Sequence, residues 1–433
     1  MNIEKLYPLA RGKAQDSSSN SGFSPPGAAV SGTAAAPLGT YTESSDPPLP
    51  ILDGRRVVRA QRYELLATAR DLLRSEGRAA GLVHPSDYHR TAKCTHTPIS
   101  NVAVLRSKEH GSAFYRGLAI CGNVWACPVC AAKVQERRRV EIAAGFDWAY
   151  AQGLQPLMIT LTFPHRSWHQ LSDLVLQQRA ALKLLRAGAP WKKLVASTGY
   201  QGLIRALEIT HGVNGWHPHT HEIWFCSSAV EAEELRASVT RQWASACMRA
   251  GLLKAEQLDA FEAHAVDVKG WCSTSDYLAK ADDSRHWGAD REMSKASTKA
   301  GKLKGMHPFG LLAAAVGDRR SAKLFIEFVE TMKTTRSRQL FWSPGLKGRA
   351  GLQEKSDEVL AEEQREEADV LGQLERGDWE RVRRNRRRAE LLDAAEVGGW
   401  PAVLILVESL RRRARSARGP SATRSTAEPP GPS

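Results

Sequence analysis

The sequence predicts an α+β protein in which an antiparallel sheet is covered by helices on one face. Residues 158–163 alternate and are rich in β-branched side chains, and 206–210 and 219–225 are two further strand segments. Helical spacing of apolar residues follows at 167–187 and 229–251. A turn at Gly212–Gly215 makes the second and third strands antiparallel neighbours. The order strand, helix, strand, strand, helix is typical of helices packed on an antiparallel sheet.

Four regions follow one another along the 433 residues. Residues 1–54 are expected to be a disordered leader, because 14–50 is rich in Ser, Pro, Gly and Ala and has no Lys or Arg. Residues 55–150 hold a short basic helix, the cysteines and a long helix at 131–150, and 151–347 hold the sheet. Residues 348–433 are expected to form a charged helical or disordered tail, with six arginines in 381–388. The arginines are either a solvated helix surface or a clamp on a DNA backbone.

The composition favours a polyanionic partner. The chain has 61 Lys and Arg against 47 acidic residues, a formal net charge of +14, and 12 Trp that offer stacking surfaces. No apolar run approaches the ~20 residues that span a bilayer. The N-terminus has no signal-peptide pattern, so we expect a cytoplasmic protein that binds no membrane.

The cysteines predict a structural zinc site. Cys127 and Cys130 form a C-x2-C pair, Cys121 lies just upstream, and Cys94 is the expected fourth ligand, with His96 as its alternative. The opposing interpretation is a set of buried core thiols. Cys226, Cys247 and Cys272 are isolated and are expected to be core thiols.

The histidines predict a second metal site. Alternate residues of a strand share a face, so His219 and His221 project together, with Ile223 and Phe225 continuing that face. Pro218 disfavours a regular strand at that point, which leaves His217 as a flanking residue. Glu208, on the neighbouring strand, is the candidate oxygen ligand for Mg²⁺ or Mn²⁺. His165 is a weaker candidate, and an ordinary surface carboxylate is the alternative for Glu208.

A tyrosine downstream of the histidines offers a nucleophile. On a helix, Tyr277 and Lys280 share a face, and a nearby cation favours the phenolate. Alone, this pair is equally typical of a half-buried Tyr beside a surface Lys.

In this order, the motifs resemble those of the HUH endonuclease superfamily, and specifically the initiators of plasmid rolling-circle replication. The resemblance covers roughly residues 90–347. It depends on the segments Cys121–Cys130, Thr160–Thr162, Gly215–His221, Tyr277–Lys280 and Phe341–Lys347.

The resemblance implies an RRM-like or ferredoxin-like sheet that holds a divalent ion at His219 and His221. It also implies Tyr277 as the nucleophile and Lys280 as the lysine one turn on. It implies nicking of one origin strand, leaving a 5′-phosphotyrosine and a free 3′-OH, with a host helicase and polymerase as partners. Some relatives carry a carboxylate or a second Tyr where this chain has Ser273, so the termination step stays open, as does the oligomeric state.

Two alternatives to a plasmid initiator remain at this point. One is a transposase or mobilisation relaxase with the same chemistry. The other is a non-catalytic, zinc-containing nucleic-acid-binding regulator whose histidines are structural.

Overall fold

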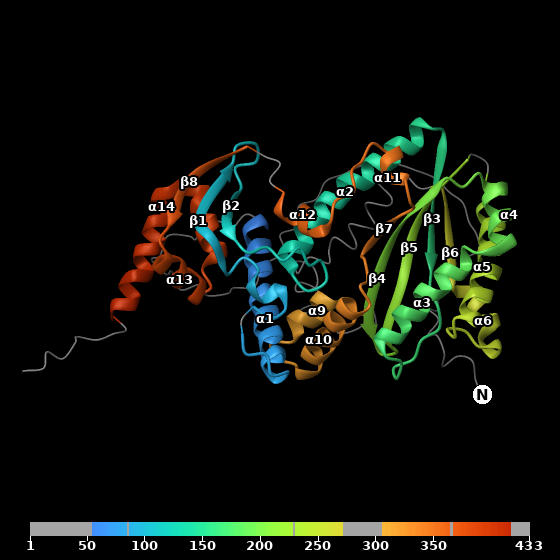
Figure 1. The fold of residues 1–433 in the computed structure, drawn as a ribbon, viewed down its shortest axis with the longest axis horizontal. Coiled ribbons are helices and arrows are strands. Elements are labelled where there is room, and N and C mark those ends of the chain that lie inside the picture. Colours follow the sequence, from blue (N-terminus) through green and yellow to red (C-terminus); the bar gives the residue numbers. More distant parts are fainter. Residues whose placement is uncertain (1–53, 85, 228–229, 272–304, 364–366, 417–433) are drawn as a thin grey trace, which may run out of the picture. The chain divides into compact units, whose positions relative to one another are not determined.

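The computed structural model describes residues 54–84, 86–227, 230–271, 305–363 and 367–416 (Figure 1). All of these residues belong to one unit of the chain, Ile51–Ser433. The expected leader and the expected helix around Tyr277 lie outside the described residues. None of the helices in the described ranges is long and apolar enough to cross a membrane.

The larger sheet has five antiparallel strands in the order β6-β3-β5-β4-β7. The three strands predicted from the sequence form its centre, and two edge strands were not anticipated. The strands are β3 (Leu154–Leu161), β4 (Gly202–Gly212), β5 (Gly215–Ser227), β6 (Val266–Trp271) and β7 (Leu340–Trp342).

The β4–β5 hairpin turns where the sequence predicted, with Gly212 paired to Gly215. Gly215 adopts a φ of 82°, and a Cβ there would meet the backbone of Ser167 at 2.8 Å. Glycine is therefore required on both counts. Because the turn has two residues, it fixes the register of every pair along the hairpin.

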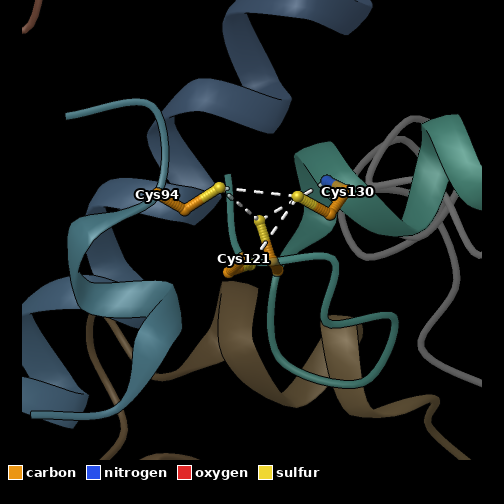
Figure 2. Close-up of side chains that lie close together, drawn as sticks. Cys94, Cys121 and Cys130 are labelled. Carbon is orange, nitrogen blue, oxygen red and sulfur yellow. Dashed lines mark hydrogen bonds between the residues drawn. The ribbon is translucent and has the colours of Figure 1, made fainter. Parts of the chain in front are cut away.

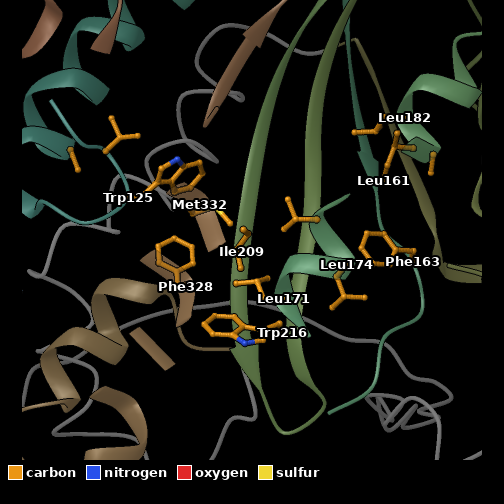
Figure 3. Packing of buried hydrophobic residues seen from close by; sticks show 14 of the residues in the cluster. Trp125, Leu161, Phe163, Leu171, Leu174, Leu182, Ile209, Trp216, Phe328 and Met332 are labelled. Carbon is orange, nitrogen blue, oxygen red and sulfur yellow. The ribbon is translucent and has the colours of Figure 1, made fainter. Parts of the chain in front are cut away.

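One face of this sheet, here called the helix face, carries Leu157, Leu203 and Trp224 and is covered by helices. α3 (Leu171–Leu185) and α5 (Ala232–Arg249) bury their apolar stripes against it, as their spacing predicted. The same core extends to Trp216, which stacks on Phe328 of α10 (Arg319–Thr334), and to Trp125 (Figure 3). The smaller helices of this region are α4 (Gly188–Thr198), α6 (Leu258–His264) and α9 (Pro308–Ala314).

The opposite face, here called the histidine face, is also covered by a helix, so the expectation of helices on one face only is corrected. α2 (Pro128–Ala151) packs Ile142 and Phe146 against Ile223 and Phe225. The rings of Phe146 and Phe225 meet edge to face, 5.9 Å apart. The physical reason is that β5 is apolar on both faces at this end, so each face needs a cover. At the other end of this face, Glu208, His219 and His221 are polar and are only partly buried.

A second sheet of three strands, in the order β2-β1-β8, joins distant parts of the chain. β1 (Pro98–Ser107) pairs with β2 (Ala113–Leu118) on one side and with β8 (Ala368–Leu374) on the other. α13 (Arg376–Arg384) and α14 (Arg388–Ser416) cover it with Trp379, Val382 and Leu391. α1 (Gly54–Ala79), the predicted basic helix, buries Leu65, Leu66 and Leu73, and it contacts α14.

The charged tail expected after residue 347 is helical in α13 and α14, which is one of its two expected forms. Residues 368–374 differ from that expectation because they form a strand, and both helices pack against the sheet. The short helices α11 (Leu346–Arg349) and α12 (Asp357–Glu362) precede them. The arginine run serves the fold: buried Arg388 donates to the Thr95 carbonyl at 2.9 Å, and Arg386 pairs with Glu64 and Asp71. The many charged residues of α13 and α14 made their few, widely spaced apolar residues hard to recognise in the sequence.

Candidate metal centres

The hairpin register brings Glu208 opposite His219, and β3 brings Thr160 opposite His221. The side chains of these four residues lie on the histidine face, since they alternate with the residues of the helix face. The predicted metal ligands are therefore gathered by backbone pairing alone.

The ligand atoms of Glu208, His219 and His221 lie within 4.8 Å of one another and could hold a metal ion. Oε2 of Glu208 is 3.3 Å from Nε2 of His219 and 3.1 Å from Nε2 of His221. All three side chains are partly buried. Two imidazoles and one carboxylate leave further positions open for solvent or substrate, as in catalytic rather than structural sites.

The other ring nitrogens orient the two imidazoles. Nδ1 of His219 donates to the carbonyl of His217 at 3.3 Å, and Nδ1 of His221 lies 3.0 Å from the Thr160 hydroxyl. When Nδ1 donates, Nε2 keeps its lone pair for a metal ion. The donor set thus fits a divalent cation.

The carboxylate of Glu208 is held in its charged form. Burial works against that form, but hydrogen bonding and electrostatic attraction between the carboxylate and the imidazoles of His219 and His221 outweigh it, so the pKa of Glu208 lies well below its usual range. An anionic ligand is therefore present at any physiological pH.

His217 and His165 flank the triad as a pair. Nδ1 of His217 lies 2.7 Å from Nε2 of His165, whose Nδ1 donates to the carbonyl of Asn214 at 3.0 Å. Burial lowers the pKa of His217 to about 3, and the neighbouring imidazoles of His219 and His165 add to this effect. Neither belongs to the cluster that could hold the ion.

His307 is a neighbour that sequence reasoning missed. It caps α9, is buried, and interacts electrostatically with Glu208. The segment that carries it returns beside β4, because Met306 and His211 exchange backbone hydrogen bonds of 2.7 and 2.9 Å. Its only sequence signal was a His-Pro pair, which is common at helix starts.

Tyr277 and Lys280 lie outside the described residues, as does Ser273. Their predicted roles stay predictions.

The second centre is the predicted cysteine cluster, which includes Cys94, Cys121, Cys127 and Cys130 (Figure 2). All four thiols are buried. Sulfur–sulfur separations are 3.4 Å for Cys94–Cys130, 3.6 Å for Cys121–Cys130 and 3.7 Å for Cys127–Cys94. A tetrahedron with Zn–S bonds of about 2.3 Å has edges of about 3.8 Å, so the four thiols fit a closed zinc site.

Backbone amides support the cluster. The amide of Cys130 donates to Sγ of Cys127, and that of Asn123 donates to Sγ of Cys121, both at 3.4 Å. Cys127 also caps α2, where Pro128 occupies the first turn. Burial and the neighbouring thiols raise the pKa of Cys127, while hydrogen bonds from those thiols lower the pKa of Cys130.

The cluster uses Cys94, and not the alternative ligand His96. The imidazole of His96 instead lies beside Arg383, with its Nδ1 3.4 Å from the guanidinium, and the His96 carbonyl accepts from the Trp379 indole at 3.1 Å. Arg70 donates to the carbonyl of Ala92 at 2.9 Å, so α1 and α14 both hold the loop that carries Cys94. Cys226 and Cys247 are buried free thiols, as expected.

These observations define an α+β protein with two separate clusters that could each hold a metal ion, one on an antiparallel sheet and one in a cysteine knuckle. The chain belongs to the Rep_1 family of replication proteins, whose family model matches residues 116–386. The resemblance to plasmid replication proteins is thereby confirmed at the level of the family.

Two relatives illustrate the similarity. The chain is 28% identical over 268 residues to "Protein rep" of Streptomyces lividans, covering 51% of this chain and 58% of that protein. It is 30% identical over 148 residues to "Neomycin resistance protein" of Streptomyces cyanogenus, covering 28% of this chain and 34% of that protein. The chain thus spans less than two thirds of either curated relative. No solved structure matches significantly.

Proposed function

We propose that this protein initiates rolling-circle replication of a plasmid by nicking one strand of the origin DNA. The observation that carries the proposal is the Glu208–His219–His221 triad, an open set of metal ligands on the sheet of a replication protein. A site with free coordination positions is suited to a substrate, whereas a structural site is closed.

Glu208, His219 and His221 would hold Mg²⁺ or Mn²⁺. When bound, that ion polarises an oxygen of the scissile phosphate and makes the phosphorus more electrophilic. Thr160 and the backbone of His217 orient the two imidazoles for this task.

Tyr277 is the proposed nucleophile. Its phenolic oxygen bonds to the phosphorus, the bond to the 3′-oxygen breaks, and the leaving oxygen takes up a proton. The products are a 5′-phosphotyrosine and a free 3′-OH that a polymerase extends. Lys280, three residues further along the sequence, would supply a cation that favours the phenolate. Because the phosphodiester energy is conserved, the reverse reaction rejoins the strand without ATP.

The four cysteines would hold Zn²⁺ in a closed structural site that braces the start of α2 against the loop at Cys94. The proposed partners are the plasmid origin, a host helicase and a polymerase. Termination, with Ser273 where some relatives carry an acid or a second Tyr, would use another acid or Tyr277 of a second copy.

The test is adduct formation. Single-stranded oligonucleotides tiled across the protein's own replicon are incubated with the full chain and Mn²⁺ or Mg²⁺, and the products are run on denaturing gels. We expect a denaturation-resistant protein–DNA adduct that is lost in Tyr277→Phe and retained in Tyr150→Phe, a matched change on α2.

An adduct in the Tyr277→Phe protein would show that another residue is the nucleophile. If no oligonucleotide is ever cut, the result favours the alternative, a non-catalytic, zinc-containing nucleic-acid-binding regulator. A transposase or relaxase would cut at a transposon end or transfer origin rather than at a replication origin.

A further inference from the structure

A hollow of about 650 Å³ lies between α4 and α5, beside the end of α3. Its apolar part is formed by buried Leu185, Leu194 and Ala246. α4 packs on the helix face of the sheet through Trp191, whose ring lies 5.4 Å from that of Trp224. The hollow is therefore separated from the metal triad by the sheet.

Three exposed cations line this hollow: Lys193 on α4, and Arg241 and Arg249 on α5. No carboxylate is among its lining residues. Within the described part of the chain, none of the three makes an ion pair or a side-chain hydrogen bond, whereas most arginines of α13 and α14 do. The hollow therefore carries positive charge that the protein does not neutralise.

The cations are placed by the periodicity of α5. Ser238, Arg241, Gln242, Ser245 and Arg249 recur at helical spacing and form one stripe that lines the hollow. The apolar stripe of the same helix, which includes Val239 and Trp243, faces the core instead. The serine hydroxyls and the Gln242 amide add hydrogen-bond donors beside the cations.

We propose that this hollow binds phosphate groups of the DNA backbone, outside the strand segment that reacts at the triad. The proposal rests on the proposed function, because it names a second contact with the same substrate. Unpaired cations with hydroxyl donors match phosphate oxygens. The lining has no aromatic side chain, and Trp191 is already packed against Trp224 and Tyr200. Bases therefore have nothing to stack on, and binding here is independent of sequence.

The test measures the salt dependence of DNA binding by the full chain. The triple variant Lys193→Ala/Arg241→Ala/Arg249→Ala and the wild type are titrated into labelled origin duplex and unrelated duplex between about 50 and 200 mM salt. Three lost phosphate contacts reduce the slope of log affinity against log salt by about 2.7. The fall in affinity over this range should then be about 40-fold smaller than in the wild type, for both duplexes.

The control is the triple variant Arg78→Ala/Lys133→Ala/Arg319→Ala, which removes the same charge from exposed positions on three other helices. The slope of log affinity against log salt for this control should differ from the wild-type slope by no more than about 0.9, the effect of one phosphate contact. Melting curves of both variants verify that they fold. If the slope falls equally in both variants, the effect comes from the loss of net positive charge and not from the hollow, and the proposal is wrong.

Two further measurements separate the possible ligands and the two proposals. If ATP or tripolyphosphate binds the wild type and not the first variant while the duplex slopes agree, the hollow is a site for free phosphate compounds and the DNA assignment is wrong. The same result with a poly-glutamate peptide would assign it to an acidic partner. Nicking of short oligonucleotides by the wild type reports on the proposed function alone. If the wild type nicks oligonucleotides but the triple variant at Lys193, Arg241 and Arg249 keeps the wild-type salt slope, the proposal for the hollow is wrong and the proposed function stands.

Discussion

The hydroxyl of Thr160 lies 3.0 Å from Nδ1 of His221, directly across the β3–β5 ladder. Thr160→Val keeps the shape of this side chain and removes its oxygen, so the imidazole of His221 loses its orientation. We expect Mn²⁺ affinity and oligonucleotide nicking to fall 10- to 100-fold, roughly the effect of losing such a supporting partner. Isothermal titration with Mn²⁺ measures the first effect.

Thr162→Val is the matched control, because the Thr162 hydroxyl contacts the carbonyl of Ala265 and not a histidine. Equal Mn²⁺ affinity in the two variants would show that Thr160 does not support His221.

The cysteine cluster predicts bound zinc. Zinc measured by mass spectrometry after dialysis should be near one per chain in the wild type and lost in Cys127→Ser/Cys130→Ser, because the knuckle supplies two of four ligands. Cys247→Ala, a buried thiol elsewhere, should keep its zinc. Retention of zinc by the double variant would place the metal at other residues.

Trp379 should be a large contributor to stability. Its side chain is 1% exposed in the core between α13 and the three-stranded sheet, and its indole bonds the His96 carbonyl. Trp379→Ala should lower the free energy of unfolding by about 3–5 kcal/mol in urea titrations. Ile405→Ala, at a side chain that is 73% exposed on α14, should change it by less than about 0.5 kcal/mol. If residues 368–416 did not pack on the rest of the protein, Trp379→Ala and Ile405→Ala would both change the free energy of unfolding only slightly.

His89 should make stability depend on pH. Burial lowers its pKa to about 4, and its Nδ1 caps a short helix by accepting from the amide of Thr91. A pKa depressed below the unfolded value of about 6.5 contributes stability that is present above pH 6.5 and lost as pH falls towards 4. The loss is at most about 1.4 kcal/mol per pH unit for this one proton.

His89→Asn keeps a capping side chain but cannot titrate. Its urea stability should therefore fall less than that of the wild type between pH 6.5 and 4.5. Parallel curves for the two proteins would mean that folding does not lower the pKa of His89.

The triad could be predicted from the sequence because two local rules suffice. The two-residue turn fixes Glu208 opposite His219, and strand alternation adds His221. Thr160 and His307 join the site through contacts between distant segments, which no local pattern encodes. The choice of Cys94 over His96 is of the same kind, since both lie in one loop that is held by Arg70, Arg388 and Trp379 from distant helices.

β8 and the helices after it could not be predicted for another reason. Val370 and Leu371 are surrounded by acidic residues, and the strand is only half covered. Its identity as a strand depends on β1, which offers it a free edge. α2 was predicted as a helix, but its place on the histidine face depends on Gly145, where a Cβ would meet the Trp342 ring at 2.8 Å.

Val102 of β1 pairs with Leu374 of β8, so neighbouring strands of one sheet come from distant parts of the sequence. A ribosome adds about 5–20 residues per second, so β1 emerges some 15–50 seconds before its partner β8 exists. Over that interval β1 presents an unpaired edge to every other nascent chain. Premature truncation anywhere before residue 368 thus leaves a product in which one edge of β1 has no partner strand.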